Sequence, residues 1–114
     1  HGGGGISAVI DRMTLVWSKF PQLQQDLKIP PNEYARRFYY DTAVFGSEYL
    51  GYLVKQFGAD RILAGTDGPT EIGERDIKGF VARAGLAPAD VEKVIGGNAE
   101  KLLTSLGALS HTPA

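Results

Sequence analysis

The sequence contains no cysteine, and only one methionine, one tryptophan and two histidines among its 114 residues. The absence of cysteine excludes disulfides and thiolate metal sites within this sequence. Neither sign of charge dominates, since 12 basic and 13 acidic side chains give a net charge of −1. This balance provides no electrostatic footprint for nucleic acid, and no apolar run approaches the length of a membrane span. We therefore expect a cytoplasmic protein that binds neither nucleic acid nor membranes.

The spacing of apolar residues predicts helices that alternate with two short strands. Residues 6–20 carry a broad apolar face at helical spacing, and residues 47–57 carry another. The short runs 38–42 and 61–66 are aromatic or apolar and end in small or acidic residues, which is typical of buried strands. Further helices are predicted at 31–37, 76–84, 88–95 and 98–106, the last with Asn98 as its N-cap. This alternation favours an α/β fold with parallel strands.

Asp67 follows the second predicted strand directly. A short apolar run that ends in a small-residue turn and a carboxylate is typical of a buried strand that places an acid at its C-terminal tip, where barrel enzymes keep their chemistry. The alternative is that the same residues form only a turn, because Asp, Gly and Pro are favoured there for backbone reasons. His1, which precedes four glycines, and Arg12, on the first predicted helix, supply two more polar groups. His1, Arg12 and Asp67 therefore form the candidate site.

The length limits the fold. A chain of 114 residues is long enough for one small domain, whereas a closed barrel of eight strand–helix units needs about 250 residues. The sequence begins with His1 and a glycine run in place of methionine. We interpret this start as the loop after a strand that lies outside the sequence; a tag remnant or a flexible linker is the alternative. We expect residues 1–106 to form part of a larger domain and residues 107–114 to be a flexible tail.

Several short motifs occur in a characteristic order. They are His1-Gly2-Gly3-Gly4, Arg12, Phe38-Tyr39-Tyr40-Asp41-Thr42, the run from Phe57 to Asp67, and Gly96-Gly97-Asn98-Ala99 with Leu102-Leu103. In this order and spacing the sequence resembles the C-terminal part of the amidohydrolase-related decarboxylases, the family of aminocarboxymuconate-semialdehyde decarboxylase. The resemblance extends from His1 to about Leu106, and it rests on the set of motifs because no single one is decisive.

The resemblance implies a partial (β/α)₈ TIM barrel that comprises about strands 7 and 8 with their flanking helices. It implies one divalent metal, usually zinc, with Asp67 as a metal ligand at the tip of the eighth strand. His1, at the tip of the sixth strand, would be the acid/base that activates metal-bound water, so His1 and Asp67 are the implied catalytic residues. Arg12 would bind a substrate carboxylate, and in the family this residue often reaches the site of a neighbouring subunit.

The sequence also departs from the family. The His-x-His pair of the first strand and the histidine ligand of the middle strands have no counterpart, because the only histidines are His1 and His111. We expect His111, in the polar tail, to be inert. A catalytic zinc usually needs about three protein ligands. The isolated chain is therefore expected to bind zinc weakly and to be inactive.

Two hypotheses for function remain open. The first is the C-terminal part of a metal-dependent carboxy-lyase for a small aromatic or unsaturated carboxylate, with a hydrolase or hydratase of the same superfamily as its near neighbour. The second is a non-catalytic association module, in which the remainder of a barrel or another copy of the chain covers exposed sheet edges. The alternative interpretation of Arg12, under either hypothesis, is a solvated charge on a helix.

Overall fold

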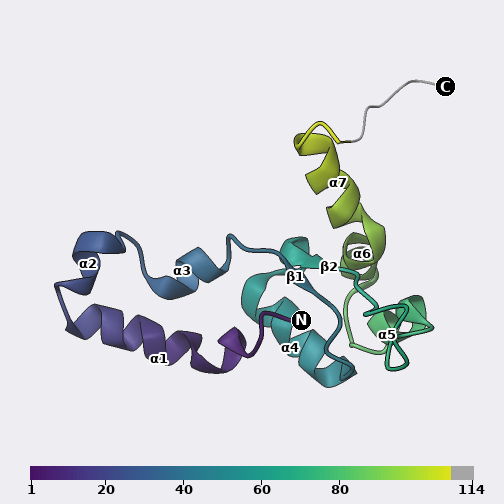
Figure 1. Cartoon of the computed structure of the whole chain (residues 1–114), viewed down its shortest axis with the longest axis horizontal. Helices are drawn as coiled ribbons and strands as arrows, with labels where there is room; N and C mark the ends of the chain where they lie inside the picture. The colour runs from purple at the N-terminus through teal and green to yellow at the C-terminus, as the bar shows by residue number, and fades with distance from the viewer. Residues whose placement is uncertain (109–114) are drawn as a thin grey trace.

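The computed structural model describes residues 1–108, so His111 and most of the predicted tail lie outside the described residues. Figure 1 shows the elements in chain order. They are α1 (Ile6–Lys19), α2 (Leu23–Asp26), α3 (Pro31–Ala35), β1 (Tyr40–Asp41), α4 (Ser47–Phe57), a 3₁₀ turn (Ala59–Arg61), β2 (Ile62–Leu63), α5 (Ile77–Ala82), α6 (Pro88–Glu92), a π-helical segment (Lys93–Gly97) and α7 (Asn98–Ser105). The predicted order of helices and strands is confirmed.

The two strands pair in parallel, as predicted. The register places Tyr40 opposite Ile62 and Asp41 opposite Leu63. Both strands are shorter than the sequence predicts, because beyond this pair the N–H groups of Ala64 and Gly65 bond to groups outside the two-stranded ladder. The Thr42 hydroxyl accepts from the Gly65 N–H at 3.0 Å and donates to the Gly65 carbonyl at 2.9 Å. The Ala64 N–H donates to the Val94 carbonyl at 3.0 Å.

The core lies between α4 and the small sheet. Leu50, Leu53 and Ile62 are fully buried there. The ring of Tyr40 stacks on Phe57 with 4.2 Å between centroids, and the Tyr40 hydroxyl donates to the Ala35 carbonyl at 2.6 Å. Burial raises the pKa of Tyr40 above its usual value, so this phenol stays neutral to higher pH than an exposed tyrosine. The aromatic pair thereby fixes β1, and with it Asp41, against α4.

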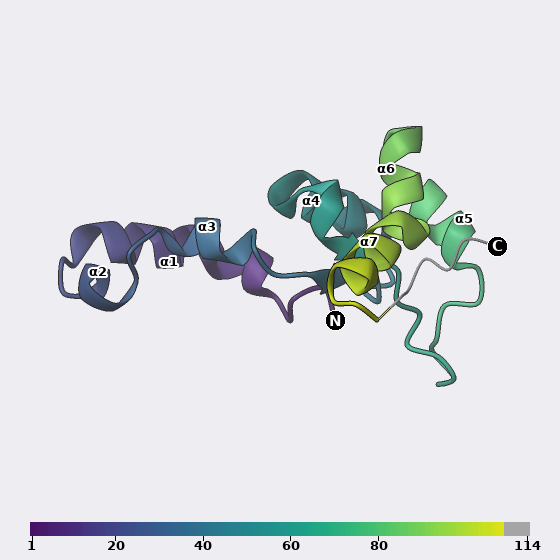
Figure 2. The same cartoon turned by 90° about the horizontal axis from the view of Figure 1, so that it is seen from above.

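Helices α1, α2 and α3 form an arm that projects from the rest of the chain (Figures 1 and 2). The radius of gyration is 16.3 Å, whereas a compact domain of this length has about 13 Å. The arm leaves large apolar side chains exposed: Val9, Met13, Leu15, Val16, Phe20, Leu23, Leu27 and Phe38. None of the helices within residues 1–108 is both long and apolar enough to cross a membrane.

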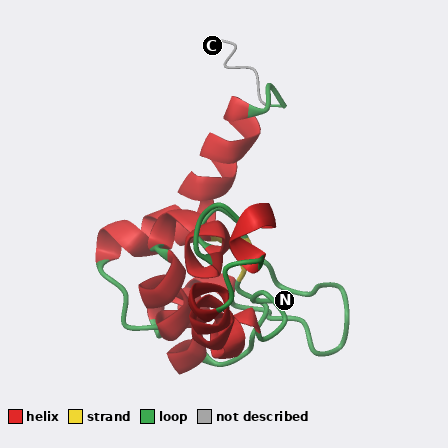
Figure 3. Ribbon diagram, turned by 90° about the vertical axis from the view of Figure 1, so that its left-hand side faces the viewer, coloured by secondary structure: helices red, strands yellow, loops and turns green. Residues whose placement is uncertain are grey.

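Figure 3 shows that helices and loops make up nearly all of the chain, with the strands confined to a small central piece. The last helices differ from the prediction. Instead of two helices separated at Gly96-Gly97, α6 continues through the π-helical segment into α7. The prediction that Asn98 caps the last helix is wrong, because its buried side chain donates to the carbonyls of Ala59 at 2.6 Å and Ile62 at 2.9 Å. Asn98 therefore ties α7 to β2.

Candidate functional site

Polar side chains meet at the carboxyl edge of the two strands. Asp41 ends β1, and Asp67 lies in the loop that follows β2. His1 lies between them: its Nδ1 is 2.7 Å from Asp41 Oδ2, and its Nε2 is 3.3 Å from Asp67 Oδ1. We call these three residues the edge cluster. The structure thus brings together two of the three candidate site residues and adds Asp41, which the sequence-based prediction left out.

The glycine run determines where His1 lies. Gly2 and Gly3 have φ values of 56° and 85°, in the left-handed region that side chains disfavour. A Cβ atom on Gly2 would lie 2.3 Å from Val44 Cγ1, and one on Gly3 would lie 2.8 Å from Tyr40 Cε1. The run is therefore a turn packed against the core, and its interpretation as a flexible linker is wrong for these two glycines. Larger residues there would displace His1 from the edge cluster.

Backbone hydrogen bonds of the surrounding loop hold Asp67 in place. Its φ of 58° is in the left-handed region, which aspartate tolerates better than most residues. The Thr70 N–H donates to the Asp67 carbonyl at 3.2 Å, and the Glu74 N–H donates to the Thr66 carbonyl at 2.8 Å. The Asp67 side chain is 24 % exposed, so one carboxylate oxygen faces His1 in a partly shielded position. The segment is both a turn and the support of a carboxylate at a strand tip.

The side chain of Asp41 forms more hydrogen bonds than the side chains of His1 and Asp67. Its Oδ1 accepts hydrogen bonds from the backbone N–H groups of Gly2 and Ala43, each at 3.0 Å, while its Oδ2 faces His1. A Cβ atom on Gly65 would lie 3.1 Å from the Cβ of Asp41, so Gly65 leaves the space that this carboxylate uses. One signal in the sequence could have found Asp41: it ends a predicted strand at the same sheet edge as Asp67.

Arg12 is not part of the edge cluster. Within residues 1–108 it forms no hydrogen bond or ion pair with His1, Asp41 or Asp67. It lies on α1, exposed, beside a groove of about 310 Å³ between the helices of the arm. The other lining residues are apolar: Met13, Val16, Trp17, Leu23, Leu27 and Pro31. The structure therefore leaves the role of Arg12 as a prediction.

The residues that could bind a metal within residues 1–108 do not make a complete ligand set. No group of three or more histidine, cysteine, aspartate or glutamate side chains there is arranged to hold a metal ion. In the edge cluster, His1 directs one ring nitrogen to each carboxylate. Asp67 has the right chemistry for one oxygen ligand, because carboxylates bind zinc and other divalent cations. The described residues thus fit one side of a metal site.

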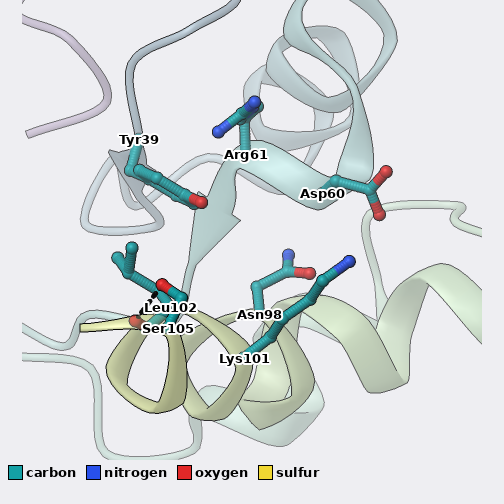
Figure 4. A pocket seen from close by; sticks show the side chains of 7 residues that line it. All are labelled: Tyr39, Asp60, Arg61, Asn98, Lys101, Leu102 and Ser105. Atoms are coloured by element: carbon teal, nitrogen blue, oxygen red, sulfur yellow. Dashed lines mark hydrogen bonds between the residues drawn. The ribbon is translucent and has the colours of Figure 1, made fainter. Parts of the chain in front are cut away.

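A separate cavity lies near the opposite ends of the strands (Figure 4). Its volume is about 310 Å³, and its lining residues are Tyr39, Asp60, Arg61, Asn98, Lys101, Leu102 and Ser105. The Arg61 guanidinium lies 5.0 Å from the centroid of the Tyr39 ring. Tyr39 and Arg61 precede β1 and β2, so this cavity is at the amino edge of the sheet. In barrel enzymes residues at that face contribute to stability rather than to chemistry.

Comparison with known proteins identifies the class. Residues 1–104 match the family described as amidohydrolase, so the chain belongs to the amidohydrolase family. It is 32 % identical over 111 residues to 2-amino-3-carboxymuconate-6-semialdehyde decarboxylase of Dictyostelium discoideum, with 90 % of this chain and 29 % of that protein covered. It is 29 % identical over 105 residues to the decarboxylase of the same name from Caenorhabditis elegans, with 90 % of this chain and 26 % of that protein covered. The chain therefore spans less than a third of the length of either relative, and the resemblance predicted from its motifs is confirmed.

Proposed function

We propose that this chain forms the C-terminal strand–helix units of a (β/α)₈ barrel in a metal-dependent carboxy-lyase. The observation that carries the proposal is the edge cluster, in which His1 and Asp67 meet at the carboxyl edge of two parallel strands. Enzymes with this fold build their active sites at that edge. The similarity to two decarboxylases supports a small aromatic or unsaturated carboxylate as the substrate class.

In this proposal Asp67 is one ligand of a divalent metal, zinc, and other parts of the complete protein supply the remaining ligands. Such a metal, when bound, lowers the pKa of a coordinated water to near 7. The position of Asp67 suits the role, because its carboxylate lies at a strand tip and its backbone is fixed by the loop of residues 66–74. Asp67 alone supplies fewer than the roughly three ligands that a catalytic zinc takes from protein.

His1 is the proposed acid/base. Decarboxylation breaks the bond between the carboxylate carbon and a ring or diene carbon, and the electron pair stays on the latter carbon until a proton arrives. An imidazole is suited to deliver that proton near neutral pH. His1 is half-exposed at the carboxyl edge, with Nε2 on the side of Asp67. Carbon dioxide leaves, and the product keeps the proton in place of the carboxylate.

Arg12 is the proposed carboxylate-binding residue. Its planar guanidinium offers two parallel N–H donors that match a carboxylate. Because α1 lies in the projecting arm, Arg12 would reach a substrate in the site of a neighbouring subunit rather than in its own. A hydrolase or hydratase would use the same metal, water and histidine, so the reaction catalysed has to be measured.

A non-catalytic association module is the second candidate, and the exposed apolar side chains of the arm favour it. One experiment separates the two. The complete protein is incubated with 2-amino-3-carboxymuconate-6-semialdehyde, and release of carbon dioxide is measured before chelation, after chelation and after zinc is restored. The proposal predicts release that is lost with the metal and recovered with it. Absence of release from the zinc-loaded protein would favour hydration, hydrolysis or the association module, which product analysis distinguishes.

A further inference from the structure

The contacts of Asp41 point to a role in orienting His1. The two carboxylate oxygens have different partners: Oδ1 accepts hydrogen bonds from the N–H groups of Gly2 and Ala43 at 3.0 Å each, and Oδ2 lies 2.7 Å from His1 Nδ1. The hydrogen bonds to Oδ1 tie the glycine turn to the end of β1. The contact of Oδ2 with Nδ1 fixes the rotation of the imidazole ring, because it anchors one of the two ring nitrogens.

The chemistry of the two partners determines which nitrogen of His1 carries hydrogen. An ionised carboxylate only accepts hydrogen bonds, so the short Nδ1–Oδ2 contact requires the hydrogen on Nδ1. Nε2 forms no hydrogen bond with any described residue, since its 3.3 Å contact with Asp67 is only an ion-pair distance, so Nε2 is the nitrogen left to exchange a proton. We propose that Asp41 is a positioning residue that holds His1 in the Nδ1–H tautomer with Nε2 directed into the site. This inference rests on the proposed acid/base role of His1.

The substitution Asp41→Asn tests the proposal without removing the backbone support. The amide oxygen of asparagine can still accept from Gly2 and Ala43, but its NH₂ group then faces His1 Nδ1 and donates to it. That contact favours the opposite tautomer, with hydrogen on Nε2. A wrong tautomer in an otherwise intact site lowers kcat by up to about 10⁴-fold in serine proteases. We expect kcat of Asp41→Asn to fall roughly 10²- to 10⁴-fold, with KM and metal content close to wild type.

The direct readout is nitrogen NMR of the complete, metal-loaded protein labelled with ¹⁵N-histidine, in which the His1 signals are those that disappear in His1→Ala. The proposal predicts hydrogen on Nδ1 in the wild type and its loss from Nδ1 in Asp41→Asn. The matched control is Asp76→Asn, since Asp76 also accepts a backbone N–H, from Gly79, but lies outside the edge cluster. This control should leave kcat and the His1 signals unchanged.

The outcomes separate this inference from the proposed function. A wild-type Nδ1 without hydrogen, or an Asp41→Asn variant that keeps hydrogen on Nδ1, would overturn the role of Asp41, and the wild-type measurement does not depend on the folding of Asp41→Asn. Near-wild-type kcat for Asp41→Asn beside an inactive His1→Ala would also overturn it, while leaving His1 as the acid/base. Wild-type kcat in both variants would overturn the proposed function itself.

Discussion

Arg12 and His1 have very different surroundings. His1 lies between two carboxylates, whereas Arg12 lies beside an apolar groove in the arm. If Arg12 binds a substrate carboxylate, Arg12→Ala removes a charged hydrogen-bond partner worth about 1.5–3 kcal/mol. We expect kcat/KM to fall roughly 10- to 150-fold, and to fall less for a substrate that lacks the carboxylate.

Steady-state kinetics of Arg12→Ala beside Lys19→Ala, an exposed cation on the same helix, provides the measurement. Partial recovery of activity on mixing Arg12→Ala with His1→Ala would show that Arg12 acts across subunits. If both arginine and lysine variants keep the wild-type kcat/KM, Arg12 is only a solvated charge.

The sequence predicts His1 and Asp67 but not Asp41, for a physical reason. A histidine before a glycine run and acids at the ends of two predicted strands are visible in the sequence, which places Asp41 at the sheet edge but gives it no role. The importance of Asp41 depends on contacts with His1, Gly2 and Ala43, and two of these come from a segment far away in the chain. Such contacts exist only after the strands have paired and the glycine turn has packed against Tyr40.

The side chain of Asn98 helps to join the C-terminal helices to the sheet. It is buried and donates to the carbonyls of Ala59 and Ile62, which lie on either side of the start of β2. Asn98→Ala would leave both carbonyls without this donor. We expect the free energy of unfolding to fall by about 1–3 kcal/mol, measured as a shift of the urea midpoint at constant m-value.

Lys101→Ala is the control for this substitution, because Lys101 is exposed on the same helix. A surface change of this kind usually alters stability by less than about 0.5 kcal/mol. A loss just as small for Asn98→Ala would contradict the account, since it would mean that water or other donors satisfy the two carbonyls.

The alternation of helices and strands could be predicted because the longer helices carry apolar residues at helical spacing, as α4 shows with its buried Leu50, Leu53 and Phe57. The ends of the elements could not. Gly96 and Gly97 indicate a helix end by composition, but the structure continues through them as a π-helical segment. The strands end early because the Thr42 hydroxyl and the Val94 carbonyl take over backbone groups of their neighbours. Tertiary contacts of this kind override local preference.

On the scale of the whole molecule, the chain is elongated and its arm exposes apolar side chains along α1 and α2. Large exposed apolar patches on proteins often mark sites of interaction with other molecules, other proteins among them. In the proposed barrel, other strand–helix units would cover part of this apolar surface, and a second subunit would bring its site to Arg12.

The central claim is that His1 moves protons and Asp67 binds metal in one active site. It is tested most directly in the complete protein by measuring kcat and bound metal in parallel for His1→Ala and Asp67→Ala, with Asp60→Ala as an exposed carboxylate control. We predict that His1→Ala retains its metal and loses roughly 10²- to 10⁴-fold in kcat, that Asp67→Ala loses both metal and rate, and that the control loses neither. An unchanged kcat for metal-loaded His1→Ala, or a full metal complement in Asp67→Ala, would contradict the account.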